Sequence, residues 1–236
     1  MDIVKGIKIE NEYLERKVNG ELVSLETSLH EAGFDSLEQY FKEKNLYQLR
    51  SCEFRIMPVT AESAPVEIIN VLTNRITSVL YIDHEITAVY YGTKDFNKDY
   101  CDQNRIPTYY YGTEGGTIIG TKGDVTLGIC FPSKIDIRTD AITEMFISMF
   151  KKYGITLTVN GNDFLLDGKK VAGTAQYEMN DMFAFIVQFT FSDESELIKN
   201  ICYTSSSMKE VTYLDKQVIS REQIKKEFFE WLQLCI

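Results

Sequence analysis

Two adjacent lysines, Lys169 and Lys170, follow a turn and stand a few positions before Gly173. A fixed lysine ammonium can stabilise negative charge that develops on an oxygen under attack. Glycine has no side chain, so a ligand can approach the backbone closely at Gly173, and a lysine on the same hairpin could reach that ligand. The alternative is an exposed hairpin with two solvated lysines, and the residue pattern by itself favours that interpretation.

The hairpin that must position these residues spans 160–176, and its turn is Asp167-Gly168, a pair typical of tight hairpins. The strand after the turn is rich in small and β-branched residues. Successive side chains along a strand point to opposite faces, and the turn fixes the register. We therefore expect Lys170 and Ala172 to share one face while Gly173 lies on the other.

Hydrophobic patterns predict the remaining elements. In the helix expected over 63–74, Val66, Ile69 and Leu72 should form the apolar side, and the strand 182–191 should be central and buried on both faces. Strands are predicted over 78–82, 86–91, 108–111, 117–119, 125–131, 155–159 and 182–191, and helices over 34–49, 63–74, 141–153, 193–200 and 220–235.

The order of these elements favours an α+β fold. Strands dominate the middle of the chain and helices are interspersed irregularly, so we expect a mixed, largely antiparallel central sheet flanked by helices, with the helices on one face. The first part of the chain is rich in glutamate and lysine and poor in strand patterns. We therefore predict an N-terminal extension of unknown role over 1–55 and a main domain over 56–236.

Composition excludes several function classes. The formal net charge of −10 argues against binding to nucleic acid or to an anionic membrane surface. Only His30 and His84 are present, which nearly excludes a histidine-rich metal site and most histidine-based catalysis. The cysteines are odd in number and lack C-x-x-C spacing, and the charged N-terminus carries no signal peptide, so we expect a reduced, cytoplasmic protein. These cysteines are Cys52, Cys101, Cys130, Cys202 and Cys235.

Three segments together resemble the biotin/lipoate protein ligase and octanoyltransferase superfamily. The hairpin sequence NDFLLDGKKVAGTAQ is close to the family's N-D-(apolar)-x-x-G-x-K-(I/V)-x-G-x-A. Residues 100–132 resemble I-P-x-x-R-R-x-x-G-G with its following strands, and residues 80–95 resemble the T-V-x-x-G segment. Order and spacing agree over roughly 80–176. The chain is identified as a divergent member, which implies a biotin/lipoate ligase-like catalytic domain over 56–236.

This resemblance singles out Lys170 rather than Lys169. The matching lysine of the family is catalytic and contacts the acyl carbonyl and, in ligases, the phosphate of the acyl-adenylate. The glycine turn would let backbone amides line the acyl or adenylate pocket. The substrate-binding residues implied are Gly115, Gly116, Thr117, Tyr110, Tyr111, Asn162, Asp163, Gly173 and Ala175.

The sequence departs from the family at its charged positions. The paired arginines fall on Tyr110 and Tyr111, the turn histidine falls on Gly120, and the arginine of the G-R-x-Q segment becomes Thr93, with Lys94 beside it as a substitute. Tyrosine replaces neither the charge nor the fork geometry of arginine. These differences weigh against an ATP-using ligase that forms an adenylate.

Cys202, in the segment N-I-C, resembles the nucleophile of one type of octanoyltransferase, which carries N-P-C at nearly this distance from its lysine. The later segment 208–212 imperfectly resembles a family M-E-(I/V)-T. The resemblance implies a dyad in which Lys170 lowers the thiol pKa, the thiolate accepts an acyl group, and a substrate lysine attacks the thioester. The alternative is that Cys202 is a small buried hydrophobe.

The leading hypothesis is transfer of a lipoyl- or octanoyl-type acyl group to a lysine of a small acyl-carrier or lipoyl-type domain. A divergent ATP-dependent lipoate or biotin ligase is one alternative. A degenerate member that binds a small molecule or partner without catalysis is another. No cofactor is firmly implied and no metal is expected; lipoate, octanoate or an acyl-adenylate would be the ligand if the family function is kept.

Overall fold

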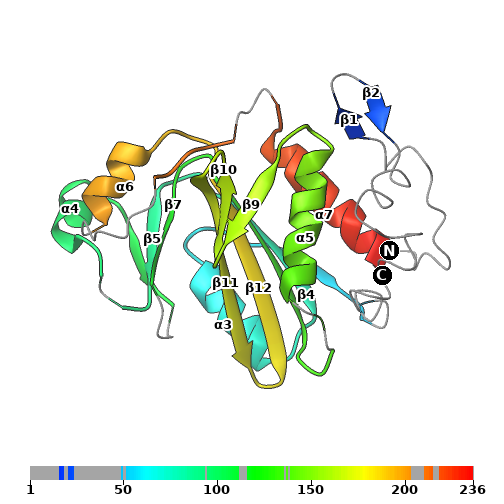
Figure 1. Ribbon diagram of the computed structural model, residues 1–236. Helices are drawn as coiled ribbons and strands as arrows, with labels where there is room; N and C mark the ends of the chain where they lie inside the picture. The colour runs from blue at the N-terminus through cyan, green and yellow to red at the C-terminus, as the bar shows by residue number, and fades with distance from the viewer. Residues whose placement is uncertain are drawn as a thin grey trace.

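Figure 1 shows the computed structural model, which describes residues 16–18, 21–23, 49, 52–93, 95–111, 116–135, 137, 139–202, 210–214 and 218–235. Several sequence predictions fall outside this part of the chain. They are the helix 34–49 apart from Leu49, the residues Lys94 and Gly115, and positions 208–209 of the segment 208–212.

A seven-stranded sheet with the order β3-β4-β8-β12-β11-β10-β9 forms the centre of the fold. Every neighbouring pair is antiparallel except β3 and β4, which confirms the mixed, largely antiparallel sheet. β12 lies between β8 and β11 and is buried along most of its length, as expected. The strands are β3 (Arg55–Pro58), β4 (Ser78–Asp83), β8 (Val125–Pro132), β9 (Leu157–Asn160), β10 (Asp163–Leu166), β11 (Lys169–Met179) and β12 (Met182–Phe189).

Two helices, α5 (Thr139–Lys151) and α7 (Arg221–Cys235), cover one face of this sheet (Figure 1). The ring of Phe146 on α5 stacks 5.5 Å from the ring of Phe228 on α7 and lies 5.6 Å from Phe189 on β12. Each fully buried phenylalanine contributes about 1.5–3 kcal/mol. A capping box starts α7, because Ser220 and Gln223 exchange backbone–side-chain hydrogen bonds.

The other face is covered by α3 (Ala64–Thr73) and by a second sheet of order β6-β5-β7. The prediction of helices on one face was therefore wrong, because β4, β8 and β12 carry apolar side chains on both faces and both need cover. The small sheet consists of β5 (Ala88–Tyr91), β6 (Thr108–Tyr110) and β7 (Thr117–Gly120).

The predicted apolar side of α3 was also wrong in part. Val66 is 70% exposed, whereas Val71 and Leu72 are fully buried. The hydroxyl of Thr73 in the last turn points to the sulfur of Met179, 3.9 Å away on β11. Burial follows a different stripe from the predicted one, made of Ala64, Pro65, Ile68, Val71 and Leu72.

Two short helices, α4 (Lys98–Gln103) and α6 (Ser195–Ile201), pack together beyond the small sheet (Figure 1). Their shared core contains Phe96, Cys101 and Ile201. Asn97 starts α4 because its side chain accepts a hydrogen bond from the backbone N–H of Tyr100 at 3.0 Å. The packing of α4 against α6 sets the position of Cys202, the residue that follows α6.

Near the N-terminus, β1 (Arg16–Val18) and β2 (Glu21–Val23) form a two-stranded hairpin. The division of the chain at residues 55 and 56 stays a prediction. Within the described ranges, no helix is long and apolar enough to cross a membrane.

Candidate functional site

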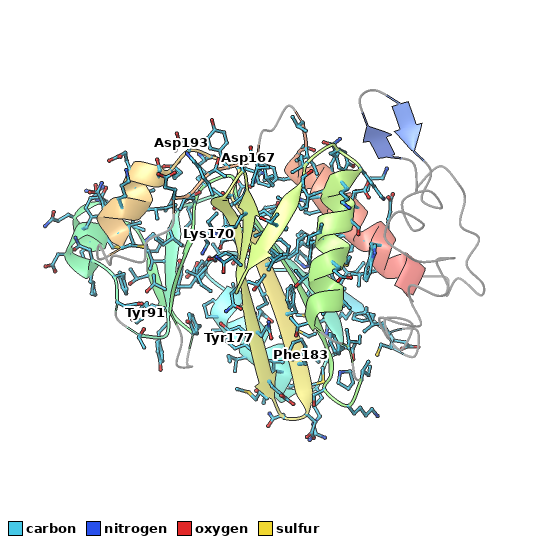
Figure 2. The ribbon with its side chains drawn as sticks, viewed as in Figure 1. Tyr91, Asp167, Lys170, Tyr177, Phe183 and Asp193 are labelled. Carbon is cyan, nitrogen blue, oxygen red and sulfur yellow. The ribbon has the colours of Figure 1, made fainter. Side chains whose placement is uncertain are left out.

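The turn of the predicted hairpin is confirmed in detail. Asp167 and Gly168 both have positive φ angles, 51° and 78°, as a type I′ turn requires. Figure 2 shows Lys170 on β11 close to this turn, and Tyr177 further along the same strand.

A β-bulge interrupts the hairpin immediately after Lys170. Leu165 pairs with Lys170 but Phe164 pairs with Ala172, so Val171 is an extra residue on β11. Val171 and Ala172 are consecutively buried, at 0% and 1% exposure. The expected strict alternation was therefore wrong, because the bulge moves Lys170 onto the face of Gly173.

Lys170 crosses directly over Gly173. A Cβ atom at position 173 would lie 3.2 Å from Nζ and 3.4 Å from Cε of Lys170. The same Nζ forms an ion pair at 2.8 Å with Oδ1 of Asp163, which is paired with Gly173 in the sheet register. The lysine side chain is 39% exposed, so the pair contributes at most about 1 kcal/mol. Its effect is to orient the ammonium rather than to stabilise the fold.

The backbone of Lys170 forms hydrogen bonds on the side of β11 away from β10. Its N–H donates to the carbonyl of Glu210 at 2.8 Å, and its carbonyl accepts from the N–H of Thr212 at 2.7 Å. Lys169, by contrast, forms an exposed pair with Glu210 at 3.2 Å. Lys169 is therefore a surface lysine, whereas Lys170 is held in a defined position.

Cys202 ends α6, where its N–H donates to the carbonyl of Ile198 at 2.8 Å, and its backbone forms a bridge to Phe96. Its side chain is partly buried. Burial raises the pKa of the thiol, the carboxylate of Asp95 raises it further, and Lys170 acts in the opposite direction. Lys170 therefore acts on the thiol pKa in the predicted direction, and desolvation by burial is the larger effect.

Asp95 lies beside this thiol in the segment between β5 and α4. The hydroxyl of Thr117 donates a hydrogen bond to its Oδ1. Sequence reasoning missed Asp95, although the G-R-x-Q pattern of the family places a glutamine at this position. The carboxylate of Asp95 in place of the family's glutamine amide was the sequence signal that could have identified this residue.

The two tyrosines at the arginine positions differ in environment. Tyr110 is 59% exposed, with its ring 5.6 Å from that of Tyr91. Tyr111 packs edge-on against Tyr177, and its hydroxyl donates to the carbonyl of Gly116 at 2.6 Å. Burial and then Asp95 raise the pKa of Tyr111. Tyr111 is therefore a neutral phenol, and it supplies none of the positive charge that an arginine would bring.

The other predicted residues lie on or directly before β7, β10 and β11. The carbonyl of Asn162 accepts hydrogen bonds from the N–H and the hydroxyl of Thr174, at 2.7 and 3.1 Å. Ala175 is opposite Ile186 on β12. Thr117 begins β7, and Gly116 directly precedes it.

His84 is a second residue that the sequence did not assign to the site. Its buried ring lies over Gly120, and a Cβ atom there would overlap it. Nε2 of His84 is 2.9 Å from the hydroxyl of Thr126, and burial lowers its pKa to about 4. The imidazole is therefore neutral near pH 7. A glycine inside a strand marks the close approach of another group. Gly120 was therefore the sequence signal for the close approach of the His84 ring.

A small apolar cavity lies between α3 and the large sheet, and Thr126, the partner of His84, is among its lining residues. Aliphatic side chains of β4 and β12 line it, and its volume of about 10 Å³ is room for about one water molecule. The lining residues are Val59, Ile68, Leu80, Ile82, Thr126, Gly128 and Ile186.

The family model described as "Lipoyl protein ligase A/B catalytic domain" matches residues 71–233, more than half of the chain. The chain belongs to this family. A search of curated protein sequences finds no match. Membership in the lipoyl protein ligase A/B family confirms the predicted superfamily and supports a lipoyl-type ligase or transferase function.

Solved structures with the same fold include lipoate-protein ligases. Plasmodium falciparum LipL1 in complex with lipoate has a TM-score of 0.64 and 13% identity, over 76% of this chain and 62% of that chain. Lipoate-protein ligase A bound with ATP has a TM-score of 0.65 and 13% identity, over 78% and 85%. The bipartite lipoate protein ligase of Thermoplasma acidophilum, analysed with its E2 lipoyl domain, has 0.65 and 12%, over 78% and 84%. The fold class is thereby confirmed, whereas the residue roles stay predictions.

Proposed function

We propose that this chain transfers a lipoyl- or octanoyl-type acyl group to a lysine of a small carrier domain, through a thioester on Cys202. One observation carries the proposal: the end of α6 and the bulged hairpin bring the Cys202 thiol within the electrostatic influence of the Lys170 ammonium. The domain that performs this reaction would be 56–236.

The charge of the site favours a transferase over an ATP-using ligase. Lys170 is already paired with Asp163, and Asp95 adds a second carboxylate. Tyr110 and Tyr111 stand where the family's arginines would grip a phosphate. A thioester donor brings no phosphate to the reacting carbon, so this charge balance does not oppose its binding.

The first half-reaction would be acylation of Cys202. The Cys202 thiol gives its proton to solvent, and the thiolate attacks the carbonyl carbon of the donor thioester. The carbon–sulfur bond of the donor then breaks, the donor thiolate takes up a proton from solvent, and the acyl group stays on Sγ. Lys170, held over Gly173, would stabilise the charge on the carbonyl oxygen during the attack.

The acceptor we propose is a lysine on a lipoyl-type domain, as the solved Thermoplasma ligase was analysed with its own lipoyl domain. The proposed compartment is the cytoplasm, because Cys101, Cys130 and Cys202 are free thiols.

A second candidate function is ligand binding without catalysis. It is favoured by the raised pKa of Cys202 and by the pairing of Lys170 with Asp163. Both features lower the reactivity of the dyad. This candidate predicts binding of an acyl ligand with no covalent adduct.

Mass spectrometry of the intact protein after incubation with an octanoyl-carrier donor separates the two. We expect an octanoyl adduct that hydroxylamine removes, present on the wild type and on Cys52→Ala and absent from Cys202→Ala. Cys52 is the matched control because it is also a partly buried cysteine. An unmodified wild type, or an adduct that persists in Cys202→Ala, would contradict the proposed function.

A further inference from the structure

Asp95 stands at the point where the small sheet meets the end of α6. It directly precedes Phe96, whose backbone bridges that of Cys202. The hydroxyl of Thr117, at the start of β7, donates to Oδ1 of Asp95 and fixes one carboxylate oxygen. Asp95 itself is exposed. A partner that approaches the thiol from solvent therefore meets this carboxylate.

The second half-reaction needs a group of this kind. A lysine side chain reaches the site as an ammonium, which has no lone pair for attack on a thioester. It must first lose a proton to a base within hydrogen-bond reach. Lys170 is a cation and would repel the incoming ammonium, and Asp163 is engaged with Lys170 at 2.8 Å. Asp95 is the carboxylate beside the thiol that does not hold that lysine.

We propose that Asp95 binds the ammonium of the acceptor lysine beside the Cys202 thioester and removes its proton. This inference rests on the proposed function and adds a residue for recognition of the acceptor. Within the described part of the chain, the hydrogen bond from Thr117 engages one carboxylate oxygen of Asp95 and leaves the second to the substrate, and the exposure of Asp95 lets a carrier domain reach it.

The step balances in atoms and charge. One proton of the ammonium moves to Asp95, and the amine nitrogen forms a bond to the thioester carbon. The carbon–sulfur bond then breaks, and the sulfur of Cys202 takes the second proton of the nitrogen to become a thiol. The amide product leaves, and Asp95 returns its proton to solvent.

The same carboxylate opposes the first half-reaction. Its negative charge raises the pKa of Cys202, whereas Lys170 lowers it. Removing the charge of Asp95 should therefore ease the formation of the thiolate and hinder the transfer to the acceptor. A residue with a purely structural role would not move the two half-reactions in opposite directions.

The test uses Asp95→Asn, which keeps the shape and the hydrogen bond from Thr117, with Asp99→Asn on α4 as a charge-matched control. Acylation of Cys202 and transfer from the isolated acyl-protein to a lipoyl-type domain are timed separately. We expect Asp95→Asn to acylate at least as fast as the wild type and to transfer 10- to 100-fold more slowly, while Asp99→Asn matches the wild type in both.

Two results overturn the role of Asp95 alone: transfer at the wild-type rate in Asp95→Asn, or an equal loss in both half-reactions. The pH profile of alkylation of Cys202 by iodoacetamide gives a readout that needs no acyl donor. We expect its midpoint to fall in Asp95→Asn, and an unchanged midpoint overturns the placement of Asp95. If the wild type never acquires an acyl group, the proposed function fails and takes this inference with it.

Discussion

Lys170 and Asp163 form an ion pair, 2.8 Å between Nζ and Oδ1, that passes over the bare α-carbon of Gly173. The pair exists because a bulge brings Lys170 to the face on which Asp163 and Gly173 meet. A positioned ammonium that lowers the pKa of a partly buried thiol is the central relationship of the site.

The two lysines of the hairpin should differ sharply when each is replaced by alanine. Lys170→Ala should slow acylation of Cys202 by about 100-fold or more, because it removes the charge that stabilises the oxyanion. Lys169→Ala should have little effect, since Lys169 forms only an exposed pair with Glu210. Single-turnover acylation rates check this prediction, and equal rates for the two variants would contradict it.

Gly173→Ala should reduce activity more than stability. The new Cβ atom would lie 3.2 Å from Nζ of Lys170, and the flexible end of that side chain can move away. We expect a stability loss below about 1 kcal/mol and a rate loss of about tenfold or more, because misplaced catalytic groups lose efficiency steeply. Thermal unfolding and acylation assays on the same sample separate the two effects. A wild-type rate would show that the position of the ammonium is not important.

Gly120→Ala should be strongly destabilising, because the added methyl group would overlap the buried ring of His84. Overpacking of this kind costs about 1–3 kcal/mol. Gly116→Ala is the control for stability, since no atom lies within 4 Å of its added Cβ. In a double-mutant cycle, His84→Ala should relieve part of the cost of Gly120→Ala. Strict additivity in urea unfolding would show that the two positions do not interact.

His84 also predicts a pH dependence of stability. Its pKa is about 4 in the folded protein, lowered by burial from 6.5. The unfolded chain therefore binds a proton first as the pH falls, so stability is lost between pH 6.5 and 4, by up to about 3 kcal/mol. Asp124 has a raised carboxyl pKa for the same reason of burial, and it acts in the opposite direction at low pH.

The difference between wild type and His84→Gln isolates the contribution of the histidine. Urea unfolding at pH 7.5, 5.5 and 4.5 should give a free energy of unfolding that falls more steeply for the wild type than for the variant. Parallel pH profiles would contradict the buried, neutral state of His84.

The sequence predicted those parts of the fold that leave a local mark. Asp167-Gly168 was recognisable as a turn because both positions need positive φ. α5 and α7 were recognisable from their apolar period, and the cap of α7 from Ser220 and Gln223. These features depend on residues that are close together in the chain.

What the sequence could not predict depends on contacts between distant residues. The extra residue at Val171 has no composition of its own, because a bulge is a property of two paired strands. α4 is too short and too polar to show a period. Asp95 contacts Thr117, and His84 contacts Gly120. Both partners lie on β7, so neither contact could be predicted from neighbouring residues in the chain.

The bulge at Val171 makes the chemistry of the hairpin depend on strand pairing as well as on residue type. If the same residues formed a regular strand without the bulge, strict alternation would place Lys170 and Gly173 on opposite faces of the sheet. Every functional residue would remain in the sequence, yet the Lys170 ammonium would turn away from Asp163. A relative with the same motif but a regular pairing at this point would keep the residues and lose the geometry that they serve.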